Sequence, residues 1–407
     1  MAMTTETQAR TRTAPELVRW RNAVFTIFAL AGFGFATWVS RVPEVRDLLH
    51  ASTDEMGLLI FGIAVGSILG LLGSSHLVAR IGATRTIAWC YSIGAVAIIA
   101  IGLVAAVAPS FWAFAVALAV LGAGTSTTDV AMNLSGAANE RAIGRTLMPL
   151  YHAAFSLGTV LGAALGALLI LIGVPLVVHL TAVGVGALVV TLVLVRYLQP
   201  AEPESADHPD AAEHGWRSRL SVWRDPRVLL VGVIVLGMAF AEGSANDWLA
   251  LAMVDGHAVT HSAGAAIFGV FVAAMTVGRI GGVVLLDRYG RVPVLRASAA
   301  LAIVGLLLVI LVPSTAVAIV GTVLWGLGAA LGFPVGMSAA ADDPKKAAAS
   351  VSAVATIGYC AFLVGPPVIG FLGQSIGLLH ALFAVLVLIV AAGLASGAAR
   401  QRTAPTD

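Results

Sequence analysis

The sequence predicts an all-α integral membrane protein, with twelve transmembrane helices arranged as two pseudo-repeats of six. Of its 407 residues, 59% are hydrophobic and 11% are charged, and the mean hydropathy is +0.96. This composition is typical of membrane proteins and excludes a soluble globule. Apolar runs of about 20 residues, long enough to cross a bilayer, recur along the whole chain. A short charged turn also occurs once in each half, which indicates an internal repeat.

The apolar runs form two sets of six. The first set covers residues 21–41, 55–78, 85–107, 110–135, 147–171 and 175–196, and the second covers 227–250, 262–286, 292–312, 315–339, 347–372 and 377–398. Between them, residues 197–226 contain Pro200, Pro203 and Pro209 among mixed charges, which predicts a solvated linker. We therefore expect six-helix bundles at 21–196 and 227–398, a tail at 1–20 and a tail at 399–407.

The distribution of basic residues predicts the orientation. If the N-terminus lies inside, 20 of the 23 lysines and arginines fall on that side, only Arg41 and Arg46 fall outside, and Arg279 lies within a span. Basic residues concentrate in cytoplasmic loops. Both termini of this multi-pass protein are therefore expected to be cytoplasmic, in the cell (cytoplasmic) membrane. This placement also explains the net charge of +2, so no nucleic-acid partner is expected.

No pattern in the sequence predicts an enzyme, a cofactor or a metal site. Cys90 and Cys360 both fall within apolar runs without ligand-like neighbours, which is typical of small core residues. There is no Walker loop, no metal-ligand spacing and no nucleophile with a plausible base.

The repeated turn is clearest at Gly281 to Arg296, GGVVLLDRYGRVPVLR, and weaker at Gly73 to Ile87, GSSHLVARIGATRTI. In each copy a glycine lets the backbone reverse while arginines stay in water. Asp287 is expected to latch a neighbouring helix, whereas Ala79 occupies its place in the first copy. The latch should thus be stronger in the C-terminal half. The gating residues predicted from the two turns are Arg80, Gly82, Asp287, Arg288, Gly290 and Arg291.

This pattern resembles the major facilitator superfamily, whose members have twelve spans and a Gly-x-x-x-Asp-Arg-x-Gly-Arg turn after spans two and eight. The resemblance covers residues 20–400. The segments TWVSRVPEVRD, DVAMNLSG, GRTLMPLYHAAFSLG and EGSANDW also resemble the YbjJ-type branch, usually placed near fucose-permease-like sugar and proton symporters. The resemblance implies alternating access around a midplane site, lined mainly by spans one, four, seven and ten.

Ionisable residues within spans are costly, so each is a functional candidate. Asp129, six residues from the inner end of span four, and His152, five residues into span five, are expected to be level and adjacent. Such a pair suits proton coupling. Asn133, one turn after Asp129, would orient the carboxylate or hold a substrate hydroxyl. The alternative is a structural ion pair of Asp129 with Arg141 or Arg145.

In the C-terminal half, Glu242 lies near the midplane of span seven, with Asn246 on the same face, and is the expected substrate or proton position. Asp247 is expected to pair with Arg41 as an outer gate. Arg279 is expected to neutralise an acid near the inner face, such as Asp342 or Asp343. For Trp325 in span ten, a stacking platform for a sugar ring and plain packing are both open.

Small residues in two spans predict close helix packing. Gly158, Gly162 and Gly166 recur every four residues in span five, and Gly365, Gly370 and Gly373 flank two prolines in span eleven. Such spacing lets helices approach closely.

The sequence therefore favours a proton-coupled symporter of a sugar-like or other polar small solute, working as a monomer within the lipid bilayer. A drug/proton antiporter is the first alternative, although span five lacks the proline of the antiporter-type Gly-Pro motif. A non-transporting sensor or scaffold on the same fold is the second. If Asp129 and Glu242 face a continuous polar cavity, transport is favoured. If neither faces such a cavity, the scaffold is favoured.

Overall fold

The computed structural model describes residues 13–145, 147–199, 222–343 and 346–401. Within these ranges the chain folds into helices, with no β-strand. Much of the expected linker and both chain ends lie outside the described residues, including Arg10, Arg12, Arg217, Arg219 and Arg402, and so does Lys345 between spans ten and eleven.

Twelve helices of the described chain are long and apolar enough to cross a membrane, which confirms the expected number of spans. In the N-terminal half they are α1 (Ala14–Val39), α3 (Thr53–Ile81), α4 (Ala83–Val107), α5 (Phe111–Ile143), α6 (Met148–Leu171) and α7 (Leu176–Leu194). A short helix, α2 (Val42–Leu49), connects α1 to α3.

The C-terminal half begins with the 3-10 turn η1 (Val222–Arg224) and repeats the plan with two interrupted spans. The uninterrupted helices are α10 (Pro226–His257), α11 (His261–Tyr289), α12 (Arg291–Leu311) and α15 (Ala347–Ile376). Span ten is divided into α13 (Thr315–Ala329) and α14 (Gly332–Ala340), and span twelve into α16 (Leu378–Ala381), α17 (Phe383–Ala395) and η2 (Ser396–Ala399).

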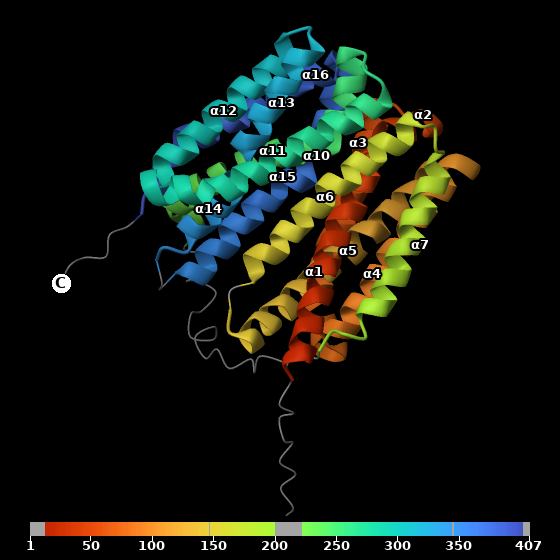
Figure 1. The fold of residues 1–407 in the computed structure, drawn as a ribbon. Helices are drawn as coiled ribbons and strands as arrows, with labels where there is room; N and C mark the ends of the chain where they lie inside the picture. Colours follow the sequence, from red (N-terminus) through yellow and green to blue (C-terminus); the bar gives the residue numbers. More distant parts are fainter. Residues whose placement is uncertain (1–12, 146, 200–221, 344–345, 402–407) are drawn as a thin grey trace, which may run out of the picture.

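The two halves lie side by side, as Figure 1 shows. The seam between them is formed chiefly by α3 against α15 and by α6 against α11. We call the end of the bundle where α1 begins and η2 ends the terminal face, and the opposite end, which carries α2, the distal face.

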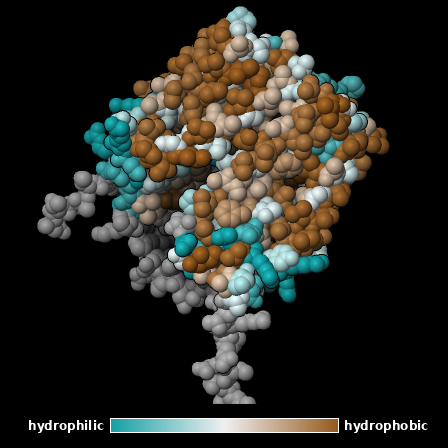
Figure 2. All heavy atoms as spheres, viewed as in Figure 1, coloured by the Kyte–Doolittle hydropathy of each residue, from teal (hydrophilic) through white to brown (hydrophobic). Residues whose placement is uncertain are grey.

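The flanks of the bundle are apolar and its ends are hydrophilic (Figure 2). Large side chains such as Leu72, Trp89 and Trp112 are exposed on these flanks. In water such a surface would be strongly unfavourable, but in a bilayer it is solvated by lipid tails. The surface therefore agrees with the membrane location that the composition predicts.

Glycines allow α1 and α6 to pack with their backbones in contact. A Cβ atom at Gly158 would lie only 1.9 Å from the carbonyl oxygen of Ala29, and one at Gly162 would lie 2.5 Å from that of Phe33. Neither position can accept a side chain without moving the helices apart. The close packing expected for this span is therefore present.

The two charged turns reverse the chain at glycines with positive φ angles, +81° at Gly82 and +76° at Gly290. A residue with a Cβ atom adopts this conformation only with strain, whereas glycine adopts it freely. Each glycine directly joins two consecutive spans, α3 to α4 and α11 to α12. The turn geometry inferred from the sequence is therefore present in both halves.

Candidate functional site

Asp129 lies deeper in its helix than the sequence suggested. The helix α5 continues to Ile143, so Asp129 is 14 residues, or about 21 Å at 1.5 Å per residue, from its end. We had expected six residues, the distance to the end of the apolar run. The extension is held by polar contacts: the hydroxyl of Tyr151 donates to Asn139 at 2.7 Å, and Glu140 accepts from the backbone N–H groups that begin α6.

The carboxylate of Asp129 is exposed within the bundle and forms no ion pair with any described residue. The Asn133 amide donates to the Asp129 side chain at 3.2 Å and to its backbone carbonyl at 2.8 Å, so Asn133 orients the carboxylate. His152 of α6 lies within electrostatic range of Asp129. The alternative expectation, an ion pair of Asp129 with Arg141 or Arg145, is therefore not met.

Asp129 faces a cavity of about 480 Å³ in the N-terminal half, which we call the Asp129 pocket. Its described lining comes from α1, α3, α4, α5, α6 and α7, with Phe362 of α15 as the contribution from the other half. Asp129 is the sole charged residue among these lining residues. Five aromatic rings contribute to the wall: Phe35, Trp38, Tyr91, Phe155 and Phe362.

A second cavity, of about 680 Å³, lies between the halves towards the terminal face, and we call it the vestibule. His152 lines it from the N-terminal half, and Arg279, Asp287 and Arg291 line it from the C-terminal half. The vestibule is thus the polar, charged part of the central space. Asp287 makes no hydrogen bond or ion pair with another described residue, so the latch expected of it is not engaged in this conformation.

Glu242 and Arg279 form an ion pair within the C-terminal half. The Nη2 atom of Arg279 lies 3.0 and 3.1 Å from the two carboxylate oxygens of Glu242, whose side chain is 18% exposed. We had expected Arg279 to neutralise Asp342 or Asp343, but α11 turns it towards α10 instead. Glu242 is therefore neutralised by a neighbouring cation, unlike Asp129.

An interruption in span ten provides a further partner for Arg279. Pro334 has no N–H with which to bond the carbonyl of Ala330, four residues earlier, and the helix breaks at this point between α13 and α14. The Nε atom of Arg279 makes a long, 3.5 Å hydrogen bond to that carbonyl. Interrupted helices with free backbone groups are typical of transporter binding regions.

The expected outer gate between Arg41 and Asp247 is not formed. Arg41 is 1% exposed and donates to His179 Nδ1 at 3.0 Å, to the carbonyl of Val174 at 3.0 Å and to Glu44. These partners lie in its own half, and each of the three guanidinium nitrogens donates to one of them. Asp247 has no hydrogen-bond or ion-pair partner among the described residues, and Asn246 beside it is half-buried without a described side-chain bond.

Trp325 is a packing residue and not an exposed platform. Its side chain is 0% exposed, and its ring packs edge-on against Phe271 with centroids 5.4 Å apart. The close approach of α12 and α13 encloses it, because Gly305 lies against the Trp325 backbone. The sugar-stacking alternative is therefore wrong for this conformation.

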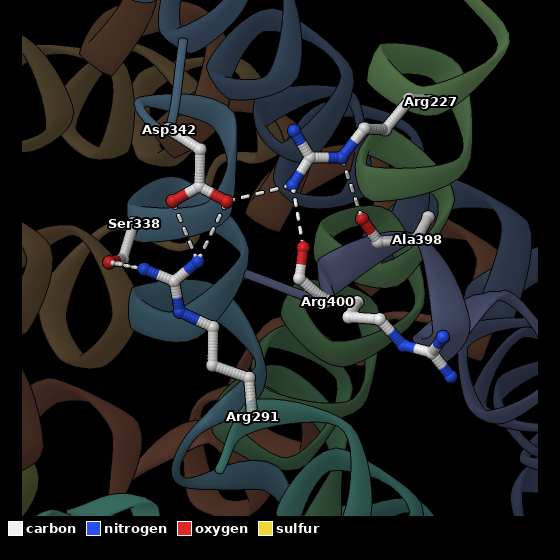
Figure 3. Close-up of polar contacts among 6 residues, drawn as sticks. All are labelled: Arg227, Arg291, Ser338, Asp342, Ala398 and Arg400. Atoms are coloured by element: carbon white, nitrogen blue, oxygen red, sulfur yellow. Dashed lines mark hydrogen bonds and ion pairs between the residues drawn. The ribbon is translucent and has the colours of Figure 1, made fainter. Parts of the chain in front are cut away.

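Arg291 of the second charged turn belongs to an ionic cluster on the terminal face (Figure 3). Its Nη1 atom lies 2.8 and 2.9 Å from the two carboxylate oxygens of Asp342, and its Nη2 atom donates to Ser338. Arg227 also donates to Asp342, at 2.7 Å, and to the carbonyls of Ala398 and Arg400. The cluster ties α10, α12, α14 and the end of the chain together.

The halves are joined at the distal face. Ser262 of α11 donates to the carbonyl of Ala167 in α6 at 2.8 Å, and the backbone N–H of Thr53 in α3 donates to Gln374 of α15 at 3.1 Å. These bonds join the two halves at this end, whereas the vestibule lies between them towards the terminal face. The bundle is therefore closed at the distal face and open at the vestibule.

Two further contacts cross the distal seam. Arg46 of α2 forms an ion pair with Asp255 of α10, and His261 Nε2 of α11 lies 3.2 Å from a carboxylate oxygen of Asp47 in α2. Burial opposes the charge of Arg46, but Asp255 and Asp47 outweigh it and raise the pKa of Arg46 above its usual value. The sequence analysis did not predict these contacts. It also did not single out His179 as a partner of Arg41, although His179 is an ionisable residue inside an apolar run and could have been noticed for that reason.

A helical membrane bundle of two similar halves, closed at one end around a polar cavity, has the architecture of a membrane transport protein. The family model of the Major Facilitator Superfamily matches residues 23–366 and, in a second alignment, 248–406. The chain belongs to this superfamily.

Sequence relatives agree with this assignment. An uncharacterised transporter of Sinorhizobium fredii is 32% identical over 386 residues, covering 92% of this chain and 98% of the relative. An uncharacterised MFS-type transporter of Yersinia pestis is 30% identical over 370 residues, covering 90% and 92%. The branch suggested by the local motifs stays a prediction.

Solved structures share the fold. The nucleoside transporter NupG superposes with a TM-score of 0.76 at 15% identity, covering 95% of this chain and all of the other. The fucose:proton symporter FucP of Escherichia coli superposes with a TM-score of 0.62 at 15% identity, covering 94% and 98%.

Proposed function

We propose that the protein is a secondary active transporter that moves a small solute across the cytoplasmic membrane by alternating access. The observation that carries the proposal is the carboxylate of Asp129, which pairs with no described cation and is exposed inside a bundle whose halves are joined at the distal face. A carboxylate within a membrane is costly and persists where it serves binding or proton transfer. A sensor or scaffold would have no use for one in this position.

The terminal face is assigned to the cytoplasm. Arginines of the described chain concentrate there, among them Arg19, Arg80, Arg85, Arg141, Arg288 and Arg296. With this orientation the structure represents an inward-open state.

Protons are the proposed coupling ion, with Asp129 and His152 as the exchanging groups. Asp129 lines the Asp129 pocket and His152 lines the vestibule. The two residues come from consecutive helices and interact electrostatically, so protonation of one changes the electrostatic energy of the other. The name of the fucose:proton symporter shows that this fold can couple solute and proton movement. Rocking of two halves within one chain needs no partner subunit, so we propose a monomer.

The test is solute-driven proton movement in proteoliposomes that contain a trapped pH dye. Sugars, nucleosides and organic amines are added in turn to wild type, to Asp129→Asn and to Asp54→Asn, a control with the same substitution on the distal face. We expect one solute class to drive a proton flux that Asp129→Asn abolishes and Asp54→Asn retains. Flux that survives Asp129→Asn would contradict the assigned role, and no flux in wild type would contradict transport coupled to protons.

A further inference from the structure

We propose that the Asp129 pocket binds a protonated amine attached to an apolar or aromatic body, so that the transported solute is an organic cation. This inference rests on the proposed transport function and names its substrate class. It departs from the sugar-like solute that the sequence favoured. The pocket's charge, its hydrogen-bonding groups and its aromatic wall support it independently.

The first argument is charge. Among the described residues that line the pocket, Asp129 alone is ionisable to a carboxylate, and no cation pairs with it. The other carboxylate proposed for substrate, Glu242, is already neutralised by Arg279. A ligand that brings its own positive charge would therefore be stabilised at Asp129, where an uncharged ligand would leave the carboxylate uncompensated.

The second argument is the direction of the hydrogen bonds. The hydroxyl groups of Ser67, Thr125, Ser126 and Thr128 all donate to backbone carbonyls, at 3.3, 2.8, 2.7 and 2.7 Å respectively. Their protons are thus used, so Ser67, Thr125 and Ser126 offer only lone pairs to a ligand, whereas Thr128 is 1% exposed. An ammonium group has three donors and no acceptor, so it matches these lone pairs.

A sugar fits the same wall poorly. Each sugar hydroxyl is both a donor and an acceptor, and burying it without both partners costs free energy. Tyr91 and Trp38 are exceptions in the wall, because the Tyr91 hydroxyl and the Trp38 indole N–H have no hydrogen-bond partner among the described residues. One phenol and one indole N–H cannot serve the several acceptors of a sugar ring.

The third argument is the aromatic wall. Trp38, Phe155 and Phe362 approach the pocket from three different helices, together with Phe35 and Tyr91. Aromatic faces attract cations and also bury apolar surface. The volume of about 480 Å³ lies within the range of pockets that enclose drug-sized molecules.

The experiment is calorimetric binding to the purified protein in detergent, with matched probes. Phenethylamine and tryptamine are compared with phenethyl alcohol and tryptophol, which have the same bodies without the charge, and with glucose. Wild type, Asp129→Asn, Asp129→Glu and the distal control Asp54→Asn are measured. Thermal unfolding and gel filtration show that each variant is folded.

We expect the amines to bind at least about tenfold more tightly than the alcohols, as a charge-assisted contact allows. Asp129→Asn should remove this difference, whereas Asp129→Glu and Asp54→Asn should retain it. Equal binding of amine and alcohol, amine binding unaffected by Asp129→Asn, or no amine binding would each overturn the proposal.

The outcome is separable from that of the proteoliposome test. A proton flux driven by a sugar or a nucleoside but by no amine would keep the transport function and overturn the substrate class. Amine binding that depends on Asp129, without flux for any solute, would support the pocket and count against coupled transport.

Discussion

Arg279 of α11 holds both carboxylate oxygens of Glu242 on α10 through one guanidinium nitrogen, at 3.0 and 3.1 Å. The pair joins the first two helices of the C-terminal half at the edge of the vestibule. In the N-terminal half, no cation among the described residues pairs with Asp129 in the same way. The two halves thus share a fold but present different charges to the central space.

The ion pair predicts a non-additive pair of substitutions. Glu242→Gln or Arg279→Gln alone leaves one unpaired charge within the membrane, and each should lower solute-driven proton flux about tenfold or more. The double variant removes both charges and should be more stable to heat than either single variant. Thermal unfolding and flux measured on all four proteins form the test, and a double variant with the summed defects of the singles would contradict it.

The distal ion pair between Arg46 and Asp255 predicts a charge-swap effect. Arg46→Asp or Asp255→Arg should weaken distal closure, and the double swap should restore it. A partly exposed pair contributes up to about 1 kcal/mol, or roughly a fivefold change in the open-to-closed ratio.

The readout is labelling of Gln374→Cys by a membrane-impermeant maleimide in a Cys360→Ser background. The single charge variants should label faster than the protein in which Arg46 and Asp255 are intact. The double swap should label at the same rate as that protein. Arg196→Asp, a charge change at the terminal face, should have no effect. A swap that labels as fast as the single variants would show that this pair does not hold the seam.

The contact between α1 and α6 predicts a position-dependent cost of adding one methyl group. Gly158→Ala places a Cβ against the Ala29 carbonyl and should destabilise the protein by about 1–3 kcal/mol, the usual cost of overpacking. Gly186→Ala on α7 is the matched control, because its Cβ would meet no atom within 4 Å. Thermal unfolding in detergent should separate the two variants, and equal melting temperatures would refute the packing argument.

The cluster around Asp342 predicts a local loss of order at the terminal face. Asp342→Ala leaves the guanidinium groups of Arg227 and Arg291 without their shared carboxylate, at a cost of about 1.5–3 kcal/mol for the lost charged hydrogen bonds. Hydrogen exchange should accelerate in α14 and at the start of α12, and less so in Asp342→Asn, which keeps an acceptor. Unchanged exchange in α14 would show that the cluster does not stabilise this region.

The sequence was sufficient for the fold because a bilayer imposes a length on every span. Each apolar run had to supply a helical span of about 20 residues or more, and the glycines of the two charged turns marked where the chain reverses. Asn133 was placed correctly beside Asp129 because residues four apart share a helix face.

Contacts between helices were predicted less well, because sequence spacing does not determine how each helix is rotated and tilted. Arg279 was assigned to an acid near its end of the membrane, but the rotation of α11 brings it to Glu242. Arg41 was predicted to pair with Asp247 across the seam, but it bonds instead to His179 of α7, which the sequence analysis did not consider. The sequence left the role of Trp325 open between sugar stacking and packing. Only the packing of α12 on α13, which buries the ring, distinguishes the two.

The Glu242–Arg279 pair also bears on how the chain enters the membrane during synthesis. Glu242 and Asp247 lie on α10, and the cation that neutralises Glu242 arrives only with α11. A carboxylate at the centre of a lone helix costs about 2.5–3.5 kcal/mol to insert. These two helices are therefore inserted more favourably as a hairpin than one at a time, so early steps of biogenesis depend on a contact that later borders the vestibule.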